Sequence, residues 1–221
     1  MPSDITSVDL TADDVEILEE DTPFRGYFRM DRYKLRHRLF AGGWSLPIMR
    51  EVFERGHAVA VVLYDPDLDR LVLVEQFRIG ALAAQRSPLY DDTSSPWLLE
   101  IMAGIIGKGE TAEAVARREA VEEAGCEITE IVPIFRYLVS PGGTTESVSL
   151  FCGRVDASNA GGVHGLADEG EDIRVLTATP EEVYAWLDEG RFINAMTLLG
   201  LIWFRAHHAE LRARWRSTDG S

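Results

Sequence analysis

Residues 104–110 read GIIGKGE, residues 118–126 read REAVEEAGC, and together they carry most of the information about the fold. Residues 111–124, which begin after the first segment and extend into the second, have the composition of a helix, and Gly125 is a typical residue to end it. A glycine-rich turn leading into a short, clearly bounded helix predicts a rigid element whose side chains can be aimed at one site.

Three glutamates lie on this predicted helix. Spacings of three and four place Glu119 on one side with Glu122 and Glu123. One interpretation is a solvated acidic face with Arg117 and Arg118 as local partners. The other is a cluster of hard oxygen ligands for Mg²⁺ or Mn²⁺. An adjacent stripe of small residues would let the helix pack closely against a sheet: Ala116, Ala120 and Ala124.

Residues 104–126 resemble the Nudix box, Gly-x5-Glu-x7-Arg-Glu-U-x-Glu-Glu-x-Gly-U with U aliphatic, at every fixed position. The small residues Ala120 and Cys126 at two U positions are minor departures. The resemblance implies an α/β/α sandwich with a mixed sheet, in fold class α/β (α+β). It also implies an enzyme that hydrolyses a nucleoside diphosphate linked to another group, with divalent metal ions held by the box.

Carried over by position, the resemblance implies a set of metal ligands. Glu119 and Glu123 would bind metal through their side chains, and Ala103 through its carbonyl oxygen. Glu122 would be a catalytic carboxylate that supports this cluster. The expected cofactor is Mg²⁺, with Mn²⁺ as an alternative, in two or three ions.

Residues 168–172 hold four acids in five positions. Taken alone, such a segment is typical of a solvated turn. The family resemblance implies instead that Glu169 is the general base for the attacking water and that Glu171 is a further metal ligand. The two could exchange roles.

The residues after the box indicate a substrate. Pro141 lies fifteen residues beyond Cys126, and a proline near that distance is typical of ADP-ribose pyrophosphatases in this family. Residues 24–215 resemble the bacterial members of that subfamily. The implied reaction converts ADP-ribose and water to AMP and ribose 5-phosphate. Two alternatives stay open: hydrolysis of another nucleotide sugar such as GDP-mannose, or a non-catalytic domain that senses ADP-ribose.

Substrate-binding residues are also implied by position. Simpler roles remain possible: a surface cation for Arg78, a solvated acid for Glu146, and core or dimer-rim positions for the residues before 56. The candidates are Tyr27, Phe28, Arg50, Glu51, Arg55, Arg78, Ser140, Pro141, Gly142 and Glu146.

The composition of the chain limits the classes of molecule that it is expected to bind. The chain has 221 residues and a formal charge of −15, which argues against nucleic acid or an anionic membrane as the main partner. Two cysteines cannot form a disulfide framework and favour a reducing compartment, the cytoplasm. No signal peptide or membrane span is expected. The family resemblance implies a homodimer with swapped N-terminal strands.

The rest of the chain predicts three regions. Residues 1–56 would be an acidic, solvated start followed by β-strands for dimerisation, residues 57–216 the hydrolase domain, and residues 217–221 a tail. The elements expected from local pattern are an edge strand at 15–18, a hairpin of 57–64 with 70–77, a loop at 80–96, strands at 97–102, 128–139, 148–155 and 173–176, and helices at 180–189 and 194–215.

Overall fold

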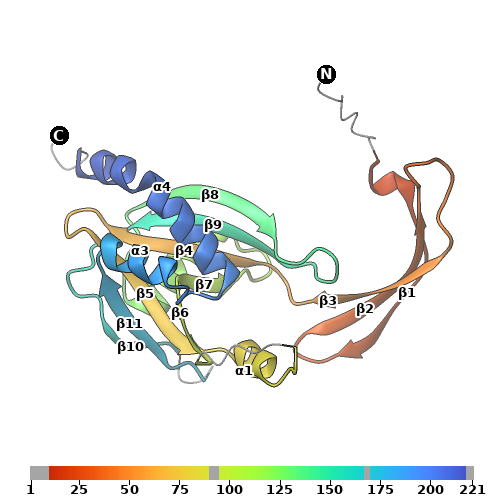
Figure 1. The fold of residues 1–221 in the computed structure, drawn as a ribbon, viewed down its shortest axis with the longest axis horizontal. Helices are drawn as coiled ribbons and strands as arrows, with labels where there is room; N and C mark the ends of the chain where they lie inside the picture. Colours follow the sequence, from red (N-terminus) through yellow and green to blue (C-terminus); the bar gives the residue numbers. More distant parts are fainter. Residues whose placement is uncertain (1–9, 90–94, 167–169, 218–221) are drawn as a thin grey trace. The chain divides into compact units, whose positions relative to one another are not determined.

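The computed structural model describes residues 10–89, 95–166 and 170–217 (Figure 1). The chain divides into two units. The N-terminal unit comprises residues 1–56 and 138–146, and the large unit comprises residues 57–137 and 147–221. None of the helices in the described part of the chain is long and apolar enough to cross a membrane.

The N-terminal unit is built on an antiparallel sheet in the order β1-β2-β3, preceded by a 3-10 turn. The predicted edge strand at 15–18 was too short, and the strand at 48–54 was not expected. The bounds are η1 Ala12–Asp14, β1 Val15–Arg25, β2 Arg29–His37 and β3 Ile48–Glu54.

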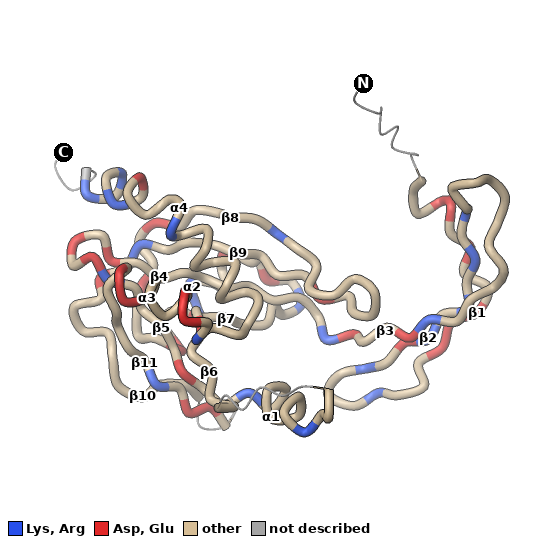
Figure 2. The backbone as a smooth tube through the Cα atoms, viewed as in Figure 1, with Lys and Arg blue, Asp and Glu red and all other residues tan. Residues whose placement is uncertain are grey.

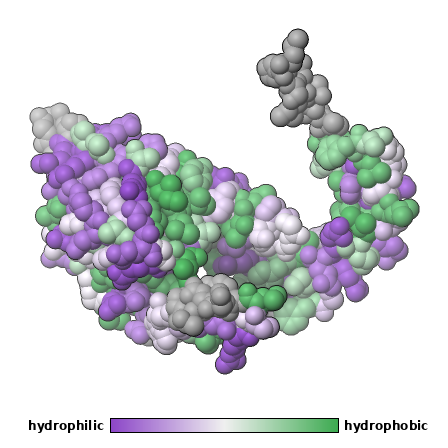
Figure 3. Space-filling view, in the orientation of Figure 1, coloured by the Kyte–Doolittle hydropathy of each residue, from purple (hydrophilic) through white to green (hydrophobic). Residues whose placement is uncertain are grey.

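Charge pairing across β1 and β2 explains the longer strand. Asp21 faces Arg32 at 2.6 Å, and two further cross-strand pairs, Glu19–Lys34 and Glu16–Arg36, lie along the same ladder. The alternating red and blue segments of these strands are visible in Figure 2. Opposite charges in register stabilise a strand pair modestly. The acids of residues 15–21 are mostly exposed to solvent, as predicted, but they also pair with the basic side chains of β2. Hydrophobic and hydrophilic residues also adjoin one another on this sheet's surface (Figure 3).

The large unit contains a mixed sheet in the order β10-β11-β5-β4-β9-β8 within the described residues. Strand β4 runs parallel to β9, whereas β5 and β7 run antiparallel to β4. The bounds are β4 Ala58–Asp65, β5 Arg70–Phe77, β6 Trp97–Glu100, β7 Met102–Ile105, β8 Glu130–Leu138, β9 Ser147–Arg154, β10 Gly162–His164 and β11 Ile173–Ala178.

Strand β4 is buried on both faces, as its uninterrupted apolar sequence requires. Its even-numbered residues join the core under α3 (Pro180–Asp188) and α4 (Ala195–Ser217). Its odd-numbered residues join the core under α2 (Ala112–Ala124). Figure 1 shows α3 and α4 together on one face of the sheet. The predicted α/β/α sandwich with a mixed sheet is confirmed.

The hairpin of β4 and β5 opens away from its turn. The two strands pair with each other from Leu63 to Asp65, and β6 and β7 then pair with β5 and β4 respectively. The single strand expected at 97–102 is therefore two strands separated at Ile101. This arrangement brings Glu100 and Ala103 into the centre of the unit.

Two other local predictions were wrong. Residues 80–96 were expected to be a loop, but α1 spans Ile79–Gln85 at its start. Its alanines and leucine favour a helix despite Gly80. A strand between 155 and 173 was also not expected, and β10 lies there because it pairs with β11.

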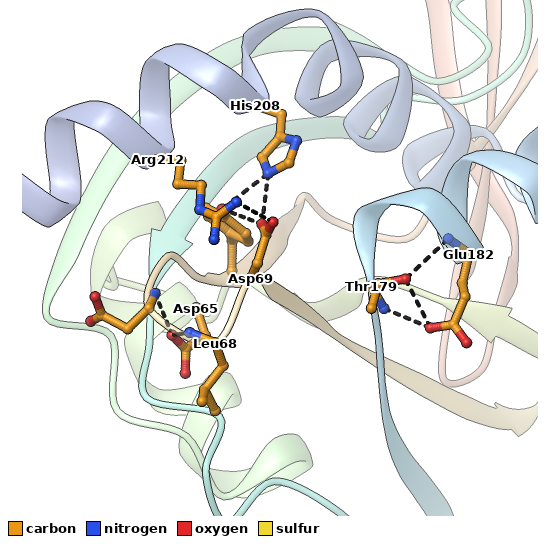
Figure 4. A network of polar contacts seen from close by, with 9 residues as sticks. Asp65, Leu68, Asp69, Thr179, Glu182, His208 and Arg212 are labelled. Carbon is orange, nitrogen blue, oxygen red and sulfur yellow. Dashed lines mark hydrogen bonds and ion pairs between the residues drawn. The ribbon is translucent and has the colours of Figure 1, made fainter.

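A polar network fastens α4 to the sheet. Asp69 accepts hydrogen bonds from Tyr64, His208 and Arg212. The side chains of Thr179 and Glu182 form a capping box at the N-terminus of α3 (Figure 4). Both histidines of α4 have packing contacts: His208 joins this network, and the ring of His207 stacks on Trp203 at 4.2 Å.

Candidate active site

Helix α2 is fixed at both ends by the residues that predicted it. Thr111 accepts a hydrogen bond from the backbone N–H of Ala114, and Gly125 ends the helix at φ 64°. The backbone N–H of Cys126 donates to the carbonyl of Ala120, which closes the last turn. The stripe of small residues is buried against the sheet, as expected, and this contact sets the rotation of the helix: Ala116, Ala120 and Ala124.

Glu123 is the buried acid of the helix, with 4% of its surface exposed. Its Oε2 accepts a hydrogen bond of 3.3 Å from the backbone N–H of Ala103 on β7. Burial raises the pKa of Glu123 to about 8; the Ala103 N–H opposes the rise and the charge of Glu119 adds to it. A carboxylate in this position needs a cation nearby to ionise fully near neutral pH.

Glu119 lies directly over Gly104. A Cβ added at Gly104 would be 2.1 Å from Oε1 of Glu119, so a side chain there would displace this carboxylate. Burial raises the pKa of Glu119, and the neighbouring Arg118, 3.0 Å away, partly offsets that effect. Gly104 is therefore required for space beside Glu119.

Glu122 is held by an arginine. The Arg118 guanidinium lies 2.7 Å from Oε2 of Glu122 and also pairs with Glu119 and Glu110. The local-partner interpretation of this acidic face is thus correct for Glu122. It does not account for Glu123, which has no such partner among the described ion pairs.

Glu171 belongs to the same cluster. Its charge contributes to the raised pKa of both Glu119 and Glu123. The backbone N–H of Leu166 donates to its Oε2 over 3.0 Å. The predicted general base, Glu169, lies outside the described residues. The structure therefore joins Ala103 to Glu123 by a hydrogen bond and places Glu119 over Gly104, while Glu171 bonds to the backbone of Leu166.

These residues fit a divalent metal. Two of the carboxylates carry raised pKa values and repel one another, which a bound cation would relieve. Their ligand atoms are hard oxygens, which Mg²⁺ and Mn²⁺ prefer. Across residues 10–89, 95–166 and 170–217, no three His, Cys, Asp or Glu side chains are already positioned around a common ion.

Arg78 approaches the cluster from the end of β5. Its Nε and one Nη lie 2.8 Å from Oε2 of Glu100, and its charge lowers the pKa of Glu123. Glu100 is 1% exposed and was not predicted as a site residue. The available signal was a single acid ending the apolar strand WLLE. Gln76, two residues before Arg78, has a buried amide nitrogen with no hydrogen-bond partner among the described residues.

Some predicted substrate residues gather within the N-terminal unit. Arg55 lies 3.3 Å from Oε1 of Glu146 and covers the ring of Phe28 at 5.6 Å. Tyr27, which is 89% exposed, contacts Phe28 edge to face. These four residues form an aromatic and charged group that the sequence suggested and the structure assembles.

Other candidates in this unit lie apart from that group. Arg50 donates to the carbonyl of Met49, and Glu51 lies opposite Arg32 in the strand ladder. The segment with Ser140, Pro141 and Gly142 forms a turn closed by the Gly143 N–H and the Ser140 carbonyl. This turn is fixed to β3 because the Phe53 N–H donates to the Gly143 carbonyl over 2.8 Å.

Residues 54–196 match the model of the NUDIX domain. This chain belongs to the Nudix family. The Escherichia coli K12 protein named ADP-ribose pyrophosphatase is 48% identical over 91% of this chain and 93% of its own length. A Haemophilus influenzae protein of the same name is 43% identical over 92% and 91%.

More distant Nudix relatives carry a different name. The Citrobacter koseri protein named GDP-mannose pyrophosphatase is 34% identical over 68% of this chain and 74% of its own length. A solved structure titled as an ADP compounds hydrolase superposes with a TM-score of 0.64, covering 88% of this chain and 96% of that one. At 19% sequence identity, that structure supports the fold alone.

Proposed function

We propose that this Nudix protein is a Mg²⁺-dependent hydrolase that converts ADP-ribose and water to AMP and ribose 5-phosphate. The observation that carries the proposal is the buried carboxylate of Glu123, which accepts a hydrogen bond from the Ala103 N–H, with Glu119 one helical turn before it on α2. Two relatives at 43–48% identity over more than nine-tenths of the chain are named for this substrate, which supports the choice of ADP-ribose.

The proposed metal ligands are the carboxylates of Glu119, Glu123 and Glu171 and the carbonyl oxygen of Ala103. When bound, Mg²⁺ would acidify a water molecule and offset the charge of the diphosphate. Two or three ions remain the expected number, with Mn²⁺ as an alternative. This arrangement also makes sense of the net charge of −15, since an anionic substrate would bind together with its cations.

The chain's own residues would then manage the proton and the orientation of the substrate. A carboxylate of the acidic segment, Glu169 in this proposal, accepts the proton of the attacking water. Glu122 supports the cluster through the shared Arg118. Arg78 presents a fixed guanidinium to the diphosphate.

The substrate is tested with purified protein, Mg²⁺ and a panel of nucleotide sugars, with the products separated and identified. We expect ADP-ribose to be cleaved fastest and to yield AMP and ribose 5-phosphate. Faster cleavage of GDP-mannose would replace the substrate assignment, and that candidate is included because of the 34% identical relative. Binding of ADP-ribose without turnover would indicate a sensor.

We further propose that residues 1–56 mediate a homodimer with exchanged strands, in which Arg55 and Phe28 of one protomer serve the substrate site of the other. Support comes from the grouping of Phe28, Arg55 and Glu146, since all three residues are predicted to contact substrate. Arg55→Ala protein and Glu123→Gln protein should be mixed, unfolded and refolded together. Activity should return in the heterodimers, because one of their two sites then combines an intact Glu123 with the Arg55 of the other protomer. Absence of any restoration, with heterodimers present, would contradict the exchange.

We also propose that the protein works in the cytoplasm. Cys126 and Cys152 are both free and buried in the structure. Burial raises the pKa of the Cys126 thiol, which keeps it protonated and poorly reactive. Free, unpaired thiols of this kind favour the reducing cytoplasm.

A further inference from the structure

Arg78 belongs to a partly buried chain of hydrogen bonds that no catalytic step described above uses. Glu100 ends β6 and places both carboxylate oxygens in contact with polar groups: Oε2 with Arg78 and Oε1 with the amide of Asn194. Asn194 in turn accepts from the backbone N–H of Thr197 over 3.1 Å. The Ile101 N–H donates to the hydroxyl of Thr197 over 3.2 Å, which returns the chain to the end of β6.

This network joins parts of the sequence that are far apart. Arg78 and Glu100 are separated by 22 positions, and Glu100 and Asn194 by 94. Thr197 is fully buried and Glu100 is 1% exposed, whereas Arg78 and Asn194 are partly exposed. Hydrogen bonds to a buried carboxylate are strong, and each side chain of the network restricts the rotamers of the side chain it contacts. The start of α4 is therefore fixed to the end of β6, whose Glu100 also binds Arg78.

The geometry leaves Arg78 available to a ligand. A guanidinium has five N–H donors, and the contacts with Glu100 use its Nε and one Nη toward a single oxygen. The side chain is 39% exposed, in contrast to the buried Glu100. One edge of the guanidinium is thus anchored to Glu100, while the side chain remains partly open to solvent.

We propose that Glu100 and Asn194 are positioning residues, which hold the Arg78 guanidinium in the orientation that receives the diphosphate of the substrate. The proposal rests on the hydrolase function proposed above. Its physical basis is preorganisation: an arginine held in place before binding loses less side-chain entropy when the substrate arrives. Without the anchor, Arg78 would swing among rotamers or turn toward the acidic cluster.

A double-mutant cycle separates positioning from general stability. With ADP-ribose and saturating Mg²⁺, Glu100→Gln should lower kcat/KM by roughly 10- to 100-fold, mainly through KM. In an Arg78→Ala background the same change should cost less than about threefold, because no guanidinium remains to be positioned. Equal losses in both backgrounds would overturn the proposal.

A direct binding measurement provides a second readout. Calorimetric titration with the α,β-methylene analogue of ADP-ribose and Mg²⁺ should give a Kd about tenfold weaker for Glu100→Gln than for the wild type. The double variant should bind no more weakly than Arg78→Ala alone. An unchanged Kd in Glu100→Gln would overturn the proposal even if turnover fell.

A milder variant covers the case in which Glu100→Gln does not fold. Asn194→Ser removes the amide that donates to Glu100, while serine can still accept from the Thr197 N–H as a helix cap. We expect KM to rise by about three- to tenfold, with thermal stability near that of the wild type. In the Arg78→Ala background the rise in KM should disappear. A KM effect that persists in that background would contradict the proposal.

Asp69→Asn is the matched structural control. It disturbs a comparable carboxylate network of the same unit, with no contact to Arg78 or the acidic cluster among the described residues. It should lower the melting temperature and leave KM unchanged. If the wild type does not cleave ADP-ribose, the proposed function fails first, and the cycle is repeated with whichever nucleotide sugar the panel identifies. If the wild type cleaves ADP-ribose but the cycle is additive, the positioning proposal alone fails.

Discussion

The backbone N–H of Ala103 donates a hydrogen bond of 3.3 Å to Oε2 of Glu123, which ties β7 to α2 beside the proposed metal site. Because the carbonyl of the same residue is a proposed metal ligand, Ala103 would both orient the buried acid and bind the ion beside it. Glu123→Gln keeps the shape but removes the charge. We expect kcat to fall by at least about a thousandfold, or roughly 4 kcal/mol of barrier, with the fold retained.

The measurement is kcat with ADP-ribose, accompanied by circular dichroism and a melting curve. Glu119→Gln should behave in the same way, since both carboxylates are proposed metal ligands. Glu113→Gln is the control on the same helix, because Glu113 is exposed and pairs with Arg117 away from the cluster. Wild-type turnover in both Glu119→Gln and Glu123→Gln would refute the metal-ligand assignment.

Metal removal tests the same site without mutation. Excess chelator should abolish hydrolysis, and added Mg²⁺ should restore it. A ligand at a hundred times its Kd stabilises the folded state by about 2.7 kcal/mol, which corresponds to a rise of roughly 5–10 °C in melting temperature for a chain of this size. The rise should be much smaller in Glu123→Gln. Equal rises in both proteins would place the ion elsewhere.

Gly104 offers a test of space rather than charge. Gly104→Ala would place a Cβ 2.1 Å from Oε1 of Glu119, so that carboxylate must move. We expect kcat to fall about a hundredfold or more, near 3 kcal/mol, while the circular dichroism spectrum is unchanged. Gly80→Ala is the matched control: a Cβ at Gly80 meets no atom within 4 Å. Equal activities of the two variants would show that Glu119 has no fixed position in catalysis.

How much of this could be predicted from sequence depends on the range of the interactions involved. Helix α2 was predicted correctly because its determinants are local: Thr111, the small-residue stripe and Gly125 all lie within one segment. The roles of the acids in the box were predicted from their positions in the family motif. By contrast, Glu100 is an isolated acid in a strand, and its partner Asn194 is 94 positions away. No local sequence pattern therefore predicts that the two residues are in contact.

The strand errors have a similar origin. Strand β1 extends beyond its apolar residues because the basic side chains of β2, such as Arg32, are in register with its acids, such as Asp21. Pattern-based analysis treats a run of acids as solvated and cannot see the partner strand. Strands β6 and β7 divide because the β4–β5 hairpin opens, which is a property of the sheet and not of residues 97–105.

The network around Asp69 predicts a dependence of stability on pH. Burial alone would raise the pKa of Asp69, but hydrogen bonds from Tyr64 and His208, together with the charge of Arg212, more than offset it and lower that pKa. Tyr184 on α3 also faces this group. A carboxylate with a lowered pKa stabilises the fold above its ordinary pKa of 3.8 and loses that contribution as the pH falls.

Asp69→Asn should therefore destabilise the protein at pH 7 by about 2 kcal/mol, the scale of hydrogen bonds to a charged group, and by progressively less below pH 4. The check is the free energy of unfolding from urea titrations of both proteins between pH 7 and pH 3. Asp13→Asn is the control, since Asp13 is an exposed residue of the short 3-10 turn in the N-terminal unit. A difference between the wild type and Asp69→Asn that stays constant down to pH 3 would mean that the network stabilises through packing instead of through the ionised carboxylate.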